Sequence, residues 1–135
     1  MTDLTLSLDD TDLPSLPTRQ QAIEDGTLVD ATTGELSPIT HQYFTVEVAM
    51  TAAVSWALDA VAEGSLNDRR GAWNDICSML RTAIELLPET SSQPEIHFSV
   101  VLSRAGRSKY WTLKAVKGLD GHGAPCLTLK LPDEA

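Results

Sequence analysis

Three runs of alternating apolar and polar side chains place the strongest constraint on the fold. The runs are EIHFSVVLSR (95–104), SKYWTLKAVK (108–117) and CLTLKL (126–131). Short Gly-containing segments separate them, at residues 105–107 and at GLDGHGAP (118–125). Because neighbouring side chains of a strand point to opposite faces, each run predicts a strand with one buried face. Residues 95–131 therefore predict an antiparallel meander with helices packed on one side.

The alternation also assigns the side chains of this meander to its two faces. The face expected to be buried holds Ile96, Phe98, Val100, Leu102, Trp111, Leu113, Ala115, Leu127, Leu129 and Leu131. The opposite face is expected to hold His97, Ser99, Ser103, Tyr110, Thr112, Lys114, Thr128 and Lys130.

Two longer segments predict the main helices. Residues 43–63 are apolar except for polar side chains at i, i+4 spacing, which would form one narrow stripe on a helix. That stripe consists of Glu47, Thr51, Ser55, Asp59 and Glu63. The β-branched start of the segment could instead be extended. A helix that is apolar around most of its surface must be covered on several sides, so we expect it in the core or in a homodimer interface. Residues 72–87 predict a second helix that ends before Pro88. Its apolar face consists of Trp73, Ile76, Cys77, Leu80, Ile84 and Leu87.

The remaining segments predict shorter elements. Residues 19–25 can form one or two helical turns that end at Gly26, and residues 27–30 a short strand. Pro38 restricts the residues after it to an edge or a loop, and residues 65–70 read as a loop. With 135 residues, 42% of them hydrophobic, the chain can bury one core. We expect a single α+β domain over residues 19–135, with two main helices packed on one face of a three- to four-stranded antiparallel sheet.

Charge is distributed unevenly along the chain. The net charge is −9, and residues 1–38 contain eight acidic residues against one basic residue. Residues 1–18 read as an acidic arm, either disordered or docked, since five leucines interrupt its acidity. Its candidate partner-binding residues are Asp3, Asp9, Asp10 and Asp12. Such an arm could occupy the nucleic-acid groove of a partner protein, provide solubility, or cover a basic surface of its own domain.

Residues 95–131 show the opposite balance, with six basic residues against two acidic ones. On the polar face of the predicted meander, His97, Tyr110, Lys114 and Lys130 would lie together. Arg104, Arg107 and Lys109 would lie at its first turn. Surfaces that bind single-stranded nucleic acid combine aromatic side chains for stacking with basic side chains for phosphate. This face is therefore a candidate nucleic-acid site, although a solvated outer face explains the same residues.

Other chemistry is weakly indicated. The two cysteines form no disulfide framework, and Cys126 is a better candidate for a reactive thiol than Cys77, which falls on an apolar helix face. GLDGHGAP precedes a strand, so it predicts a hairpin rather than a phosphate-binding loop. His122 lacks further ligands nearby in the sequence. We therefore expect no catalytic residue, metal or cofactor. With no signal peptide and no apolar run of membrane-spanning length, we expect a cytoplasmic location.

Four further stretches of the chain are informative together. They are QAIEDGTLVDATT (21–33), VAMTAAV (48–54), RRGAWNDICSMLR (69–81) and LKAVKGLDGHGAPCLTLKLPDE (113–134). In this order they resemble a family of small uncharacterised proteins found on bacterial plasmids and other mobile elements. The resemblance implies an accessory protein of a plasmid, phage or integrated element and implies no activity. We expect a non-catalytic protein that binds and inhibits or masks a host protein. The alternatives are a nucleic-acid-binding module and a small enzyme without a recognisable signature.

Overall fold

The computed structural model describes residues 19–87, 94–104, 107–120 and 122–134. Within them, five strands form one mixed sheet in the order β2-β3-β6-β5-β4. The strands are β2 (Leu28–Asp30), β3 (Glu47–Thr51), β4 (Glu95–Arg104), β5 (Arg107–Leu119) and β6 (Pro125–Lys130). Neighbouring strands are antiparallel except for β3 and β6, which are parallel. The α+β class is confirmed, while the expected three to four antiparallel strands match this sheet only roughly.

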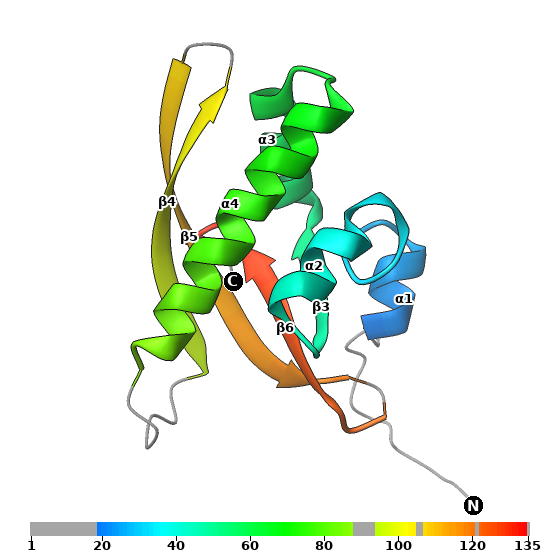
Figure 1. Cartoon of the computed structure of the whole chain (residues 1–135). Coiled ribbons are helices and arrows are strands. Elements are labelled where there is room, and N and C mark those ends of the chain that lie inside the picture. The colour runs from blue at the N-terminus through cyan, green and yellow to red at the C-terminus, as the bar shows by residue number, and fades with distance from the viewer. Residues whose placement is uncertain (1–18, 88–93, 105–106, 121, 135) are drawn as a thin grey trace, which may run out of the picture.

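The helices are α1 (Arg19–Glu24), the short 3-10 helix η1 (Gly34–Leu36), α2 (Ser37–Tyr43), α3 (Ala52–Ala62) and α4 (Leu66–Glu85). Helices α2, α3 and α4 pack together on one face of the sheet, whereas α1 contacts β2 and its Arg19 bonds to Glu47 and Thr128 on the other face. Helix α4 crosses the β4 side of the sheet and packs against α2 and α3 (Figure 1). The largest fully buried side chains include Trp73 and Ile76 of α4, Met50 of β3 and Leu129 of β6. The core therefore lies between α4 and the inner face of the sheet.

The C-terminal meander is confirmed. Strands β4, β5 and β6 pair in sequence order, and Ala115 lies opposite both Ile96 and Leu129 on the inner face. All but one of the ten apolar side chains predicted for this face are buried, and Leu131 is partly buried. Alternation was informative here because these strands bury only one face.

The helix predicted over residues 43–63 is confirmed only for its second half, which forms α3. Residues 47–51 are extended instead and form strand β3, in which Val48, Ala49 and Met50 are all fully buried. A strand buried on both faces has no polar alternation, so its sequence looks like that of a buried helix. Thr51 separates the two elements, because its backbone is extended and its Oγ1 accepts a hydrogen bond from the Val54 amide. The predicted polar stripe is therefore split between a strand and a helix.

Two shorter predictions are also corrected. Residues 66–70 are the first turns of α4, because Ser65 Oγ accepts a hydrogen bond from the Asp68 amide and so starts the helix. Pro38 lies in the first turn of α2 rather than in an edge or loop, since its lack of an N–H costs nothing there. The predicted apolar face of the second helix is confirmed by the burial of Trp73, Ile76 and Leu80. None of the described helices is both long and apolar enough to cross a membrane.

Candidate partner-binding surface

The structure brings together three residues of the predicted basic face. His97 lies opposite Lys114, and Lys114 lies opposite Lys130, so the three form a row across β4, β5 and β6. They lie on the outer face, which points away from α4. His97 is exposed, and its Nε2 lies 3.4 Å from Glu95 Oε1. The strand register therefore places the three residues in one row, but their side chains differ in exposure to solvent.

Lys114 is only 6% exposed, because the end of the chain folds over it. Its Nζ donates a hydrogen bond to the backbone oxygen of Glu134. The Glu134 carboxylate is fixed in turn, since Oε1 accepts hydrogen bonds from Thr51 Oγ1 at 2.8 Å and from the Leu131 amide at 3.3 Å. A lysine held in this way has its ammonium directed at a protein oxygen rather than at an incoming phosphate.

The other predicted site residues are more dispersed. Tyr110 is 69% exposed on the outer face and lies opposite Val101, which is 56% exposed. Lys109 is exposed next to it. Arg104 and Arg107 pair at the ends of β4 and β5, and their side chains lie outside the described part. The acidic candidates Asp3, Asp9, Asp10 and Asp12 also lie outside the described residues.

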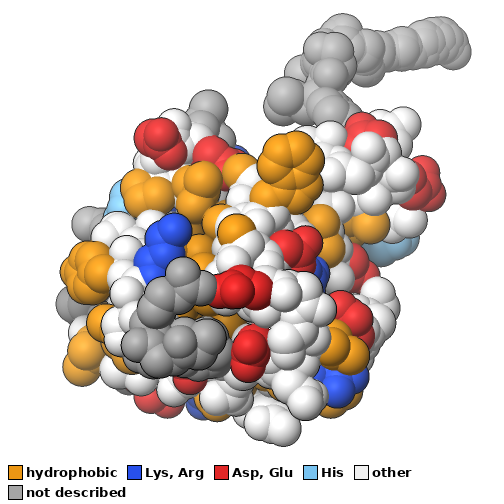
Figure 2. Space-filling model, turned by 90° about the horizontal axis from the view of Figure 1, so that it is seen from above, with side chains coloured by type: hydrophobic (Ala, Val, Ile, Leu, Met, Phe, Trp, Pro, Cys, Tyr) orange, Lys and Arg blue, Asp and Glu red, His pale blue; other side chains and the backbone are white. Residues whose placement is uncertain are grey.

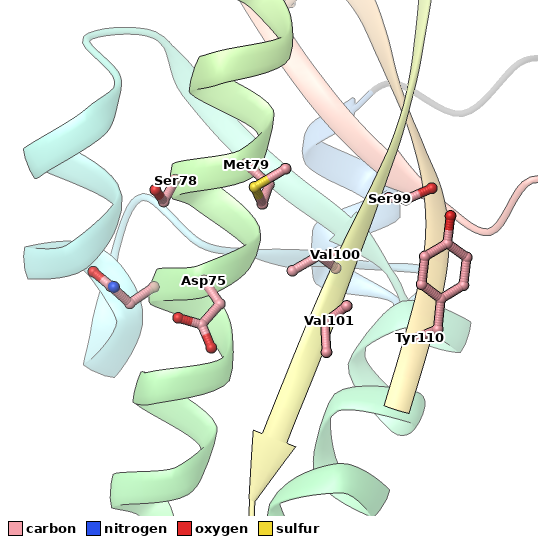
Figure 3. Close-up of a pocket in the computed structure, with 8 residues that line it drawn as sticks. Asp75, Ser78, Met79, Ser99, Val100, Val101 and Tyr110 are labelled. Atoms are coloured by element: carbon pink, nitrogen blue, oxygen red, sulfur yellow. The ribbon is translucent and has the colours of Figure 1, made fainter. Parts of the chain in front are cut away.

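A pocket of about 380 Å³ extends between α4 and the free side of β4, and Figure 3 shows the residues that line it. Its lining comes from three elements and consists of Asn74, Asp75, Ser78, Met79, Ser99, Val100, Val101 and Tyr110. In Figure 3, Met79 projects from α4 toward β4, and Tyr110 lies across β4 on the other side. Met79, Val101 and Tyr110 are exposed. The pocket therefore offers apolar contact area next to polar side chains.

Strand β4 itself is the second feature of this surface. Among the described residues, it pairs only with β5 and forms one edge of the sheet. Backbone N–H and C=O groups alternate in direction along a strand, so an edge strand presents a row of such groups to a partner. Protected edges commonly carry Lys or Pro. The only charged residues of β4 are Glu95 and Arg104 at its two ends, apart from the titratable His97.

Sequence reasoning missed the α4 side of this surface. The polarity of Asn74, Asp75 and Ser78 predicts a solvated helix face. The available signal was Met79 in the middle of that polar face and Val101 at a position where alternation predicts a polar residue. Met79 and Val101 belong to different elements, so the sequence did not indicate that they line the same pocket.

Both cysteines are free and buried. Burial raises the pKa of the Cys77 thiol to about 12. Burial also raises the pKa of the Cys126 thiol, although the positive charge of Arg19 acts in the opposite direction. Since the thiolate is the nucleophile, both thiols are poor nucleophiles near neutral pH. Among the described residues, no group of three metal-ligating side chains lies together.

The loop around His122 is a hairpin connection, as predicted. Asp120 Oδ1 accepts hydrogen bonds from the backbone amides of His122 and Ala124 at 2.8 and 2.9 Å. These bonds lower the pKa of the Asp120 carboxyl. Gly123 has a φ of +79°, a backbone conformation that favours glycine. The loop amides of His122 and Ala124 thus bind the Asp120 carboxylate, and this contact stabilises the connection between β5 and β6.

Two further surfaces complete the description. A second pocket, of about 410 Å³, lies between the end of α4 and the ends of β5 and β6, with Tyr43, Ile84 and Leu127 in its lining. On α3, Ala53, Trp56 and Ala60 are exposed, so this helix is the part of residues 43–63 that a second copy could contact. Seen from above, hydrophobic side chains lie among acidic ones (Figure 2).

Comparison of the chain with protein-family models, with curated proteins and with solved structures found no match. The surface formed by the free edge of β4 and the adjoining pocket is accordingly interpreted from its own geometry.

Proposed function

We propose that this chain is a non-catalytic accessory protein that binds a host protein and inhibits or masks it. We assign the contact to the free edge of β4 together with the pocket beside α4. One observation carries this proposal: an edge strand of ten residues, Glu95–Arg104, is bordered by exposed apolar side chains on both sides. Exposed apolar groups next to unpaired strand edges are typical of protein-binding surfaces.

The mode of binding that this surface supports is strand addition. An extended partner segment would hydrogen-bond to the backbone of β4, and its alternate side chains would contact either the pocket or the outer face. Tyr110, Met79 and Val101 would be the anchors, since large apolar and aromatic side chains dominate the energy of interfaces. The backbone bonds would supply affinity and the pocket residues of α4 would supply selectivity.

The proposed biological setting rests on the resemblance to small proteins of plasmids and other mobile elements. A strong negative charge also supports a protein partner, because it repels nucleic acid and speeds encounter with a basic protein. The nucleic-acid alternative has less support, since Lys114 is engaged by Glu134. The enzyme alternative has no nominated nucleophile, since burial raises the pKa of both thiols.

Affinity purification from cells that carry the gene tests this proposal. The tagged full chain should retain one protein in a stoichiometric complex. Val101→Lys and Tyr110→Lys should each lose that protein, because a buried lysine opposes docking at the edge. Leu119→Lys is the matched control, since Leu119 is 70% exposed and lies at the other end of β5. The proposal would be refuted if the unchanged chain retained only background proteins. It would also be refuted if Leu119→Lys lost the captured protein to the same extent as the two test variants.

A further inference from the structure

On the outer face, β4 and the first part of β5 are exposed in the part of the chain that the structure describes, whereas Lys114 and Cys126 further along are covered. Helix α4 and its neighbours lie on the opposite face (Figure 1). Val101 and Tyr110 lie opposite each other on the outer face, and both are more than half exposed. Val116 lies in line with Tyr110 on β5 and is half-buried. A face of this kind, with adjacent exposed apolar side chains, is suited to a covering segment.

The first described residue is anchored on this same face. Arg19 Nε donates to Glu47 Oε1 at 2.7 Å, and Nη1 donates to Thr128 Oγ1 at 2.5 Å. Nη2 donates to the backbone oxygen of Leu127 at 2.8 Å. Thr128 points away from the core, since its neighbours Leu127 and Leu129 belong to the core. The segment that precedes Arg19 therefore starts on the outer face, over β3 and β6.

The segment before Arg19 is long enough to reach Val101 and Tyr110. Arg19 bonds to Thr128, which lies opposite Val116, and Tyr110 is six residues further along β5, or about 20 Å away. Eighteen residues precede Arg19, and an extended chain of that length spans up to about 60 Å. The preceding segment is thus about three times as long as the path from Arg19 to Tyr110.

The composition of residues 1–18 matches this face in two respects. Leu4, Leu6 and Leu8 alternate with Thr and Ser, which is the pattern of a segment with one apolar side. Four aspartates and no basic residue give the segment a negative charge. On the outer face, Lys130 lies opposite the covered Lys114, whereas the strand register puts Lys109 and Lys117 on the side of Leu102 and Leu127.

From these observations we propose that residues 1–18 dock across the outer face of β4, β5 and β6. The leucines cover Val101 and Tyr110, and the aspartates lie toward Lys130. Because Val101 and Tyr110 also border the proposed partner site, the docked segment and the partner exclude each other. Docking is independent of the partner, and only this competition rests on the proposed function.

A spin label on residue 7 of the full chain tests the docking. Ser7→Cys supplies an accessible thiol, whereas Cys77 and Cys126 are buried. In the ¹⁵N-labelled protein, the amide signals of Val101, Tyr110 and Thr112 should broaden, and those of Trp56 and Ala60 on α3 should not. Adding Val101→Asp and Tyr110→Asp should abolish the broadening, while Leu119→Asp should leave it unchanged.

Three outcomes would overturn the docking. They are no broadening on the outer face, stronger broadening on α3, and equal broadening with the Val101 and Tyr110 replacements. A second sample mixes spin-labelled protein that contains no ¹⁵N with ¹⁵N-labelled protein that carries no spin label. This sample distinguishes contacts within one chain from contacts between two chains. If the mixture shows all of the broadening, the occupant is the segment of a second copy and the intramolecular proposal is wrong.

The competition has its own readout once a partner has been captured. Replacing Leu4, Leu6 and Leu8 by Asp should release the segment, because the leucines are the residues that cover Val101 and Tyr110. If the docked form is about 90% populated, its release tightens partner binding about tenfold. Docking with unchanged partner affinity would refute the competition, whereas docking without any captured partner would refute only the proposed function.

Discussion

Thr40 is a fully buried polar side chain, and its replacement gives the sharpest test of the described packing. Its Oγ1 donates toward the backbone oxygen of Ala31 at 2.6 Å, and the oxygen of Leu36 lies at 3.1 Å. The same oxygen accepts a hydrogen bond from Trp73 Nε1 at 3.0 Å. One hydroxyl thus connects the β2 side of the fold, α2 and the central residue of α4.

Thr40→Val removes the hydroxyl and leaves the buried indole N–H of Trp73 without an acceptor. A lost hydrogen bond costs about 1 kcal/mol, and a stranded buried donor costs about 1–3 kcal/mol. The added methyl group returns up to about 1 kcal/mol by burial. We therefore expect the free energy of unfolding to fall by about 1–3 kcal/mol. With an m-value of about 2 kcal/mol/M, the urea midpoint falls by roughly 0.5–1.5 M.

Urea unfolding followed by fluorescence and by circular dichroism measures this loss. Thr82→Val is the matched control, because Thr82 is exposed and its Oγ1 bonds only to the oxygen of Ser78. This control should cost less than about 0.5 kcal/mol. Trp73→Phe removes the stranded donor, so Thr40→Val should cost about 1–2 kcal/mol less in that background. Equal costs for Thr40→Val and the control, or an undiminished cost beside Trp73→Phe, would refute the reasoning.

Three further predictions concern chemistry and charge. Both thiols of the folded protein should react slowly with an aromatic disulfide reagent, because burial raises the pKa of Cys77 to about 12 and also raises that of Cys126. Thiol titration with and without urea measures this, and a full equivalent released from folded protein would contradict it. Burial opposes ionisation of Asp30, but hydrogen bonds from its neighbours, chiefly Thr32, outweigh burial and lower its pKa. Its contribution to stability is therefore complete above about pH 4 and is lost as the pH falls through the lower folded-state pKa. Asp30→Asn should flatten the acid side of the stability curve, and an unchanged curve would count against this role. Arg19→Lys should cost about 1–2 kcal/mol, since one ammonium cannot reproduce the three bonds of the guanidinium. Hydrogen exchange should then speed up in α1, and unchanged exchange would show that α1 is held by other contacts.

Parts of the candidate surface could be predicted from the sequence. Alternation alone assigned Tyr110, His97 and Lys130 to one face of the meander, and the register of β4, β5 and β6 confirms that assignment. The same pattern could not reveal that Lys114 is covered by Glu134, because that contact joins residues twenty positions apart around a chain reversal. Nor could it place Met79 beside Val101, since neither residue's local pattern specifies its neighbour on another element.

By itself, the sequence determined the elements that bury a single face. The period of two in residues 95–131 and the 3-4 spacing of Trp73, Ile76 and Leu80 both record the boundary between core and solvent. The tertiary structure alone decided the identity of residues 47–51. These residues lie between β2 and β6 with a fully buried centre, so no solvent-facing position marks their period. Their parallel pairing with a strand almost eighty residues later depends on packing between distant segments, which a local pattern does not encode.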